Sequence, residues 1–404
     1  MSNRWPGKTV IGLTGNIATG KSVVRRMLEA LDAFGIDADG LAHRAMSPGA
    51  PAYQPIVDTF GRWILAPDGQ IDRAKLGKLV FTDPEALSHL EAITHPIVKQ
   101  VVDLLIRRSD KKVVAIEAIK LLESGMAEDC DSIWVVDAPE SVQIKRLMQT
   151  RNMTESEARI RMAAQPAQAD KLARANVVIQ NADGYEQTLK QVQQHLNALI
   201  GAPPPPEEAA AEEVRPTPAE APAPSPVAAE QPAAVPAPAP TTTEIVVTRG
   251  GPRQAEMIAA FINRITGTSL TRADVLLRFG QKAYMIAERG GEVVGLSGWQ
   301  VENLITRIDE LLFAPDAPVE QTTAKLLESI ERASNDLQSE ISLLFLSQAA
   351  PATVQQAVQA NGYARMEIAD LKVPDWQEAA KESAPPNTVL AVKRLREDRV
   401  LKPI

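Results

Sequence analysis

The stretch GLTGNIATGKSVV, residues 12–24, decides the fold of the first half of the chain. From Gly15 to Ser22 it follows the pattern G-x-x-x-x-G-K-[ST] without a mismatch. Residues 10–13 before it read as a short buried strand. The apolar residues after it recur with the spacing of a helix, at Val23, Val24, Met27, Leu28 and Leu31. Strand, glycine-rich loop and helix together predict a phosphate-binding loop, since a chance match in a turn would lack both flanks.

The residues of this loop are of the types that hold a nucleotide. Glycines allow a tight loop whose N–H groups face phosphate oxygens, and the N-terminus of the following helix adds partial positive charge. We expect Lys21 to reach the β- and γ-phosphates and the Ser22 hydroxyl to bind Mg²⁺. The residues expected to bind ATP are Gly15, Asn16, Ile17, Ala18, Thr19, Gly20, Lys21, Ser22 and Val23.

Length and composition narrow the class of protein. A chain of 404 residues indicates two domains rather than one. The net charge of −8 argues against nucleic-acid binding through a broadly basic surface. The single cysteine, Cys130, excludes a disulfide framework and a cysteine-based zinc site. Because we find neither a signal-peptide pattern nor an apolar run of membrane-spanning length, we expect a cytoplasmic protein with no membrane and no nucleic-acid partner.

Two carboxylates follow the next apolar segment. Residues 34–40 read as a short strand that ends in Asp37 and Asp39. In open α/β sheets, ligands bind at the carboxyl ends of the strands. Asp39 could therefore accept the proton of an attacking hydroxyl or hold Mg²⁺, with Asp37 in support. The alternative is that Asp39 only caps a helix over residues 41–46, and the spacing alone leaves both interpretations open.

Three segments carry a resemblance to a known family: GLTGNIATGKS at 12–22, DADGLAHR at 37–44, and DGQIDRAKLGKLVFTDPEALSHLEAITHPIV at 68–98. Together they resemble dephospho-CoA kinase, which passes the γ-phosphoryl group of ATP to the 3′-hydroxyl of dephospho-CoA in the last step of coenzyme A synthesis. The resemblance spans residues 8–198. It implies ATP and dephospho-CoA as substrates and Mg²⁺ as cofactor.

The resemblance also implies roles for single residues. It assigns catalysis to Lys21, Asp39, Arg151 and Arg161. It assigns contacts with the acceptor substrate to Thr14, Asp37, His43, Arg73 and His95. From composition alone, Arg73 would be a solvated arginine and His95 a histidine held before Pro96.

An arginine-rich segment after residue 140 is the expected lid. Arg146, Arg151, Arg159 and Arg161 lie within sixteen residues, and Thr154 and Glu157 form a capping box for a helix. Phosphoryl transfer needs mobile positive charge over the γ-phosphate, although such a run is also typical of a solvated helix face. The family resemblance matches Arg151, Arg161 and Gln165 to its lid.

The two halves of the chain are separated by a segment of different composition. Residues 201–243 are rich in proline, alanine and glutamate and contain no aromatic residue. They cannot bury a core, and we expect a semi-extended linker. The predicted domains are therefore 1–200, the linker 201–243, and 244–404.

The second half predicts an α+β domain. A Gly290-Gly291 turn joins two alternating apolar segments into a hairpin, and further strands and helices follow. Their order is similar to that of the GNAT acyltransferase superfamily, which binds the pyrophosphate of acetyl-CoA through a glycine-containing loop. The matching stretch here, residues 318–325, lacks the glycines and contains Glu320, so we expect a degenerate binding or assembly module of unknown ligand.

The predicted fold of the first half is a phosphate-loop kinase with three α/β/α layers, a parallel sheet, a helical substrate region and a lid. Residues 113–119 and 133–139 supply two further buried strands. The function expected from these observations is dephospho-CoA kinase. Two alternatives stay open from the sequence: another nucleoside or nucleotide kinase on this scaffold, and an ATP-sensing regulatory protein with a ligand-binding GNAT-like module.

Overall fold

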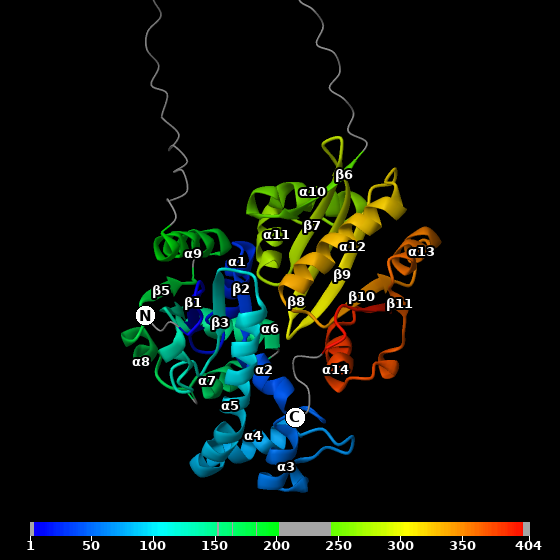
Figure 1. The fold of residues 1–404 in the computed structure, drawn as a ribbon. Coiled ribbons are helices and arrows are strands. Elements are labelled where there is room, and N and C mark those ends of the chain that lie inside the picture. Colours follow the sequence, from blue (N-terminus) through cyan, green and yellow to red (C-terminus); the bar gives the residue numbers. More distant parts are fainter. Residues whose placement is uncertain (1–3, 152, 164, 183, 202–243, 399–404) are drawn as a thin grey trace, which may run out of the picture.

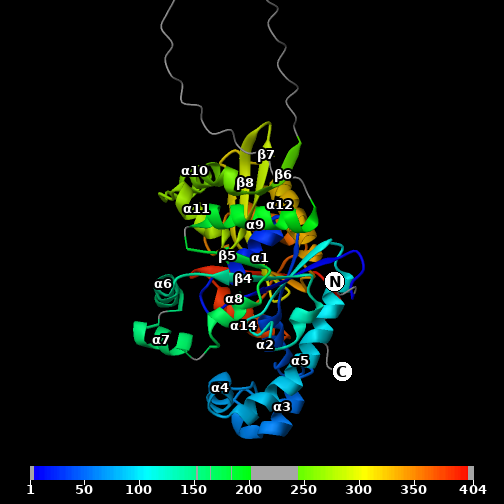
Figure 2. The same ribbon diagram turned by 90° about the vertical axis from the view of Figure 1, so that its left-hand side faces the viewer.

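Two sheets with their covering helices make up the computed structural model (Figures 1 and 2). The structure describes residues 4–151, 153–163, 165–182, 184–201 and 244–398. We call residues 4–201 the N-terminal half and residues 244–398 the C-terminal half. The linker expected at 201–243 lies outside the described residues except at Gly201.

The N-terminal half is built on five parallel strands in the order β2-β3-β1-β4-β5. The strand that precedes the glycine-rich loop is β1, at the centre of the sheet. This is the parallel sheet that the sequence predicted. The strands are β1 Thr9–Thr14, β2 Phe34–Asp37, β3 Val113–Glu117, β4 Ser132–Asp137 and β5 Val177–Gln180.

Helices cover both faces of this sheet because its strands are apolar on both sides. Successive side chains of a strand point to opposite faces. Val10 accordingly packs in one core with helix α5, Pro84–Arg108. The next residue, Ile11, packs in a second core with α1, Lys21–Ala30, and α9, Tyr185–Ile200. The expected three-layer α/β/α architecture is confirmed.

The other helices of this half lie beyond the carboxyl ends of the strands or below the sheet in Figure 1. One expectation is corrected here: the strand stops at Asp37, whose side chain caps α2 by accepting the Gly40 N–H, and Asp39 belongs to the helix. The helices are α2 Ala38–Ala45, α3 Tyr53–Phe60, α4 Arg73–Thr82, α6 Glu140–Arg151, α7 Glu155–Ala163 and α8 Gln168–Ala173.

The C-terminal half contains a seven-stranded mixed sheet in the order β11-β12-β10-β9-β8-β7-β6. Its described strand pairs are antiparallel except β9 with β10. The Gly290–Gly291 turn joins β7 to β8, as expected, with φ of 62° and 86°. The strands are β6 Ile245–Gly250, β7 Ala283–Arg289, β8 Glu292–Glu302, β9 Ile305–Phe313, β10 Ile341–Ser347, β11 Ala364–Arg365 and β12 Thr388–Arg394.

The faces of this sheet are also both covered. On β10, Leu344 packs with α12 and α13, while Leu343 and Phe345 pack with α14. The α+β order predicted for this half is confirmed, but α11, α14 and β11 were not predicted, although Thr271 and Asp274 form a capping box at the start of α11. The helices are α10 Ala255–Thr266, α11 Arg272–Phe279, α12 Val319–Asp336, α13 Ala352–Ala360 and α14 Pro374–Ser383.

The two halves pack against each other. Leu304, between β8 and β9, is buried in the same core as α5 and β2 of the N-terminal half. Farther along the contact, the rings of Tyr185 in α9 and Phe279 in α11 lie 6.2 Å apart. Figure 2 shows α9 beside α11. The C-terminal half therefore packs against β2, α5 and α9 of the N-terminal half.

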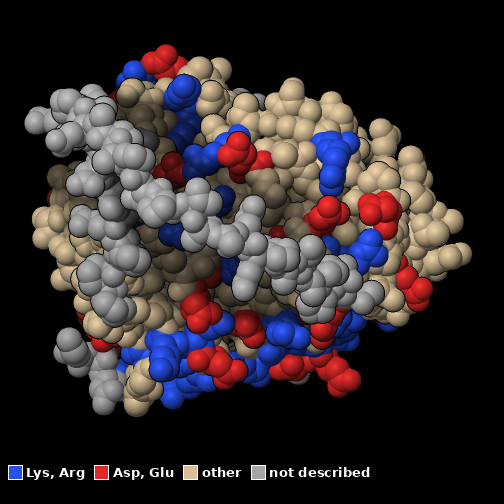
Figure 3. Space-filling view, turned by 90° about the horizontal axis from the view of Figure 1, so that it is seen from above, with Lys and Arg blue, Asp and Glu red and all other residues tan. Residues whose placement is uncertain are grey.

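Surface charge is mixed on the face that Figure 3 shows. Lysine and arginine side chains there lie beside aspartate and glutamate side chains along one edge (Figure 3). Within the described part of the chain, no helix is both long and apolar enough to cross a membrane.

Replacement of Leu326 by alanine tests the packing of α12. Leu326 is 0% exposed, so the substitution leaves a cavity. We expect the free energy of unfolding, measured by urea titration, to fall by about 2–5 kcal/mol. The matched control is Leu277→Ala in α11, where the side chain is 67% exposed. The control should change the free energy by less than about 0.5 kcal/mol, and equal losses in the two variants would contradict this packing.

Candidate active site

The phosphate loop takes backbone conformations that demand its glycines. Gly15 has φ of 149° and Gly20 has φ of 97°. A Cβ atom on Gly15 would lie 2.4 Å from the carbonyl oxygen of Val136, which is too close for any side chain. Ala18, where φ is 59°, adopts the left-handed region that non-glycine residues rarely enter. The loop is therefore held in one shape between β1 and α1.

Side chains from the segment after α7 hold the first part of the loop. The Ile17 N–H donates to Gln165 Oε1 at 2.7 Å, and the Asn16 N–H donates to Gln168 Oε1 at 3.0 Å. Lys21 Nζ donates to the Asn16 carbonyl at 3.2 Å. We expected all loop N–H groups to face a phosphate, whereas these two already have protein acceptors. Gln165 and Gln168 thus link the lid segment to the loop.

The other part of the loop is held by Arg146 and Asn181. Arg146 Nη1 donates to the carbonyls of Ala18 and Thr19, both at 3.1 Å. Asn181 Nδ2 donates to the Thr19 carbonyl at 2.8 Å. The sequence placed Arg146 in a mobile arginine cluster, but in the structure it supports the loop backbone. A long-range contact of this kind leaves no local pattern in the sequence.

Glu117 is a buried carboxylate beside the loop, and it is not among the site residues predicted from the sequence. Glu117 ends β3; its Oε1 accepts the Ser22 hydroxyl at 2.6 Å, and its Oε2 accepts Arg25 Nε at 2.8 Å. Burial by itself raises the pKa of Glu117, but the charges of Arg25 and Lys21 and the Ser22 hydrogen bond outweigh it, so the pKa is lowered. The available signal was an acid at the end of the apolar segment VVAIE, at the carboxyl end of a strand.

The two aspartates of α2 have different surroundings. Asp37 accepts the Gly40 N–H at 2.9 Å, and burial, followed by the nearby Glu117 charge, raises its pKa to about 6. Asp39 Oδ2 accepts the Ile119 N–H at 2.9 Å, and its side chain stays open to solvent. Partial removal of water by the surrounding protein still raises the pKa of Asp39, while Lys21 and Lys171 act in the opposite direction.

The peptide groups of Ile119 bind two of the expected site residues, Thr14 and Asp39, and also Lys171. Its carbonyl accepts Lys171 Nζ at 2.7 Å and the Thr14 hydroxyl at 3.2 Å, while its N–H binds Asp39. Burial lowers the pKa of Lys171. Thr14, Asp39 and Lys171 therefore meet at the carboxyl ends of β1 and β3.

The remaining acceptor-side residues fall into two places. His43 and Arg73 line one hollow between the two halves, where Arg73 Nη2 lies 3.2 Å from Glu378 Oε2. His43 Nε2 is buried there without a hydrogen-bond partner among the described residues. His95 lies apart from this hollow in α5, where burial lowers its pKa and Glu91 faces it. The structure thus brings His43 and Arg73 together and leaves His95 separate.

The expected lid is formed by α6 and α7. The capping box is confirmed, because the Thr154 N–H donates to Glu157 Oε2 at 2.8 Å and the Glu157 N–H donates to Thr154 Oγ1 at 3.3 Å. Arg159 forms exposed ion pairs with Glu140 and Glu155, as a solvated face would. Arg161 is exposed on α7. Arg151 ends α6, and its side chain lies outside what the structure describes.

The donor atoms near the loop suit a hard cation. The Ser22 hydroxyl gives its hydrogen to Glu117, and both oxygen lone pairs are left for a metal ion. Mg²⁺ prefers oxygen ligands and usually combines one or two protein groups with substrate phosphates and waters. Among the described residues, no group of three or more His, Cys, Asp or Glu side chains forms a metal cage.

Asp37→Asn tests the raised pKa of this aspartate. Asparagine also caps helices but does not titrate. Because the pKa of about 6 in the folded protein exceeds the ordinary 3.8, the proton stabilises the folded state; this contribution is complete below about pH 4 and is lost as pH rises through 6. The wild type should lose stability relative to the variant by about 1.4 kcal/mol per pH unit in this window. Urea titrations of both proteins from pH 4 to 7 measure this difference in the free energy of unfolding. A difference that does not change with pH would contradict the raised pKa of Asp37.

The C-terminal half aligns with solved acetyltransferases. One, an acetyltransferase of the GNAT family from Streptococcus pneumoniae, is 13% identical, and the alignment covers 37% of this chain and 99% of that chain with a TM-score of 0.29. A likeness at this identity concerns the fold alone.

The N-terminal half has closer relatives. The dephospho-CoA kinase family model matches residues 9–187. A dephospho-CoA kinase structure from Campylobacter jejuni aligns with 27% identity and a TM-score of 0.36, over 48% of this chain and 98% of that chain. The dephospho-CoA kinase of Geobacter sulfurreducens is 43% identical over 188 residues, which cover 46% of this chain and 95% of that protein. With such identity across nearly the full length of a relative, the chain belongs to the dephospho-CoA kinase family.

Proposed function

We propose that the chain transfers the γ-phosphoryl group of ATP to the 3′-hydroxyl of dephospho-CoA at the carboxyl ends of β1, β2 and β3. The observation that carries this proposal is the meeting of Asp39, Lys171 and Thr14 around Ile119, with the Lys21 charge facing Asp39. A proton acceptor and two ammonium groups beside a phosphate loop are the parts that phosphoryl transfer requires. Membership of the family supports the same reaction.

ATP binds through the loop in this proposal. The loop backbone and Lys21 hold the phosphates, and Arg146 and Asn181 keep the loop rigid by bonding to its carbonyls. A loop whose shape is set before the nucleotide arrives loses little conformational entropy on binding. Gln165 and Gln168 couple loop occupancy to the lid segment, because both accept loop N–H groups.

Ser22 is the residue that would hold Mg²⁺ in this site, and its hydroxyl is oriented by the hydrogen bond that it donates to Glu117. When bound, the ion supplies positive charge to the phosphate oxygens. Glu117 also accepts a hydrogen bond from Arg25, which fixes the carboxylate and, through it, the orientation of the Ser22 hydroxyl.

Asp39 is the proposed base. It takes the proton of the 3′-hydroxyl as that oxygen bonds to the γ-phosphorus and the bond from phosphorus to the ADP oxygen breaks. A raised pKa makes the carboxylate a better proton acceptor near neutral pH. Asp37 suits this role less, because one of its carboxylate oxygens caps α2 and because its carboxylate lies close to the negative charge of Glu117.

The remaining assignments follow the resemblance to the family. Arg151 and Arg161 close over the transferring group from the lid. His43 and Arg73 contact the acceptor from the hollow between the halves, and Thr14, Asp37 and His95 complete its side of the site.

The C-terminal half is proposed to be a separate binding or assembly domain rather than an acetyltransferase, joined by the segment 201–243. Helix α12 begins at Val319 after Pro318, and Glu320 lies exposed in its first turn. A carboxylate at this helix end repels a pyrophosphate group. The cytoplasmic location stays a prediction from the sequence.

The direct test is ADP release by the purified chain with ATP, Mg²⁺ and dephospho-CoA, beside adenosine, uridine and cytidine monophosphate as acceptors. We expect turnover with dephospho-CoA alone and loss of at least about two orders of magnitude in kcat for Lys21→Ala, since the lysine stabilises phosphate charge in the transition state. Turnover with another acceptor would mean that the substrate is that acceptor and not dephospho-CoA. ATP binding without any turnover would favour the ATP-sensing regulatory alternative.

Separate substitution of the two aspartates identifies the base. Asp39→Asn should lower kcat by about 10²–10⁴-fold with little change in the Kd for dephospho-CoA, because only proton transfer is lost. Asp37→Asn, the matched control, keeps its capping hydrogen bond and should lower kcat far less. The reverse order of the two losses would make Asp37 the base.

A further inference from the structure

We propose that the C-terminal half is a working part of the kinase site: through Arg44 and the turn Asn303–Leu304 it holds α2, and so fixes the position of Asp39. Arg44 is then a positioning residue, since it acts on the reaction through the helix. This inference rests on the role of Asp39 proposed above.

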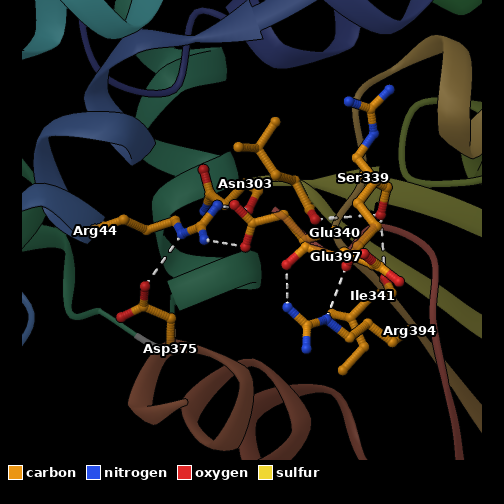
Figure 4. Close-up of polar contacts among 10 residues, drawn as sticks. Arg44, Asn303, Ser339, Glu340, Ile341, Asp375, Arg394 and Glu397 are labelled. Carbon is orange, nitrogen blue, oxygen red and sulfur yellow. Dashed lines mark hydrogen bonds and ion pairs between the residues drawn. The ribbon is translucent and has the colours of Figure 1, made fainter. Parts of the chain in front are cut away.

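Arg44, in the last turn of α2, is bound by three groups of the C-terminal half (Figure 4). Its Nη2 lies 3.0 Å from Glu340 Oε2, and its Nε lies 3.2 Å from Asp375 Oδ2. Its Nη1 donates to the carbonyl oxygen of Asn303. All three charged side chains are no more than 6% exposed. The guanidinium therefore spans three separate acceptors in a buried place, which the single ammonium group of a lysine would not match.

The first turn of α2 is held by the same half. The turn between β8 and β9 puts Asn303 and Leu304 in the left-handed region, with φ of 51° and 62°. A Cβ atom on Gly40 would lie 1.8 Å from Asn303 Oδ1, so the turn rests directly on the helix backbone. Leu304 is buried in a core that also contains Leu41. The two-residue turn between these antiparallel strands requires positive φ at both positions, so the hairpin itself fixes the shape that is presented to α2.

The charges make this contact depend on Arg44. Glu340 and Asp375 place two carboxylates in a buried site, and the Arg44 guanidinium binds both of them. Removal of one partner from a buried ion pair is strongly unfavourable, whereas neutralising all the partners together costs far less. A variant in which only Arg44 is neutralised should therefore weaken the contact between α2 and the C-terminal half. Neutralising Glu340 and Asp375 as well should restore it.

Asp39 immediately precedes Gly40, where the turn of the C-terminal half rests on the first turn of α2. Its carboxylate must stay near the loop lysine, and a displacement of about 1 Å is enough to slow a reaction strongly. The phosphate loop has supports within the N-terminal half, from Arg146, Asn181 and Gln165. Loosening α2 should therefore impair use of the acceptor more than binding of ATP.

The test uses the full chain as wild type, as Arg44→Gln, and as the neutralised variant Arg44→Gln with Glu340→Gln and Asp375→Asn. For each we measure kcat and KM for dephospho-CoA and for ATP, and hydrogen exchange of the α2 amides. The matched control is Gln300→Ala. It removes a different contact between the halves, the 3.0 Å hydrogen bond from Arg26 in α1, and leaves the α2 contacts intact.

We expect Arg44→Gln to lower kcat/KM for dephospho-CoA by about tenfold or more, to change KM for ATP by less than about twofold, and to speed exchange in α2. The neutralised variant should recover most of both effects, and the control should resemble the wild type. Equal losses for ATP and dephospho-CoA, exchange that rises throughout the N-terminal half, or no recovery in the neutralised variant would overturn the inference. If the wild type shows no turnover, the proposed function fails instead, and α2 exchange alone decides whether the C-terminal half holds this helix.

Discussion

The buried carboxylate of Glu117 is the contact on which the site depends. One of its oxygens binds the Ser22 hydroxyl and the other binds Arg25, so a single side chain on β3 fixes two residues of α1. A carboxylate accepts hydrogen bonds from both sides. Burial raises the pKa of Glu117, but the Arg25 charge and the Ser22 hydrogen bond outweigh it and keep the pKa low, which preserves the charge that makes the contact strong. The loop, the strand and the helix are thereby locked in one arrangement before any nucleotide is present.

The loop itself is held from outside by residues distant in sequence. Arg146 and Asn181 bind its carbonyls, while Gln165 and Gln168 bind its N–H groups. A backbone in left-handed conformations, as at Ala18, stores strain that such contacts must offset. The same residues belong to the segments that follow β4, so hydrogen bonds join these segments to the phosphate loop.

The chain couples this family's scaffold to a second sheet through α2. The helix is capped at one end by its own Asp37 and is bound at the other by Arg44 to the C-terminal half. Docking of this kind combines apolar burial, at Leu304, with a buried ion cluster. Apolar burial holds the two halves together. The buried charges tolerate little displacement, so they fix how one surface is aligned on the other. Joining the two sheets in one chain raises their effective concentration and makes such an interface favourable.

The sequence by itself determined the phosphate loop, the three-layer parallel sheet and the order of most strands in the C-terminal half. These features depend on local spacing: glycines at a tight loop, apolar residues at helical or alternating periods, and turn residues such as Gly290. It also indicated Asp37 and Asp39, but it offered Asp39 as the possible helix cap, whereas Asp37 caps α2. Only the tertiary structure decided that Glu117 binds Ser22 and that Arg44 is bound by the second half. Such contacts join residues far apart in the chain, and a charged side chain carries the same letter whether it is solvated or buried against a distant partner.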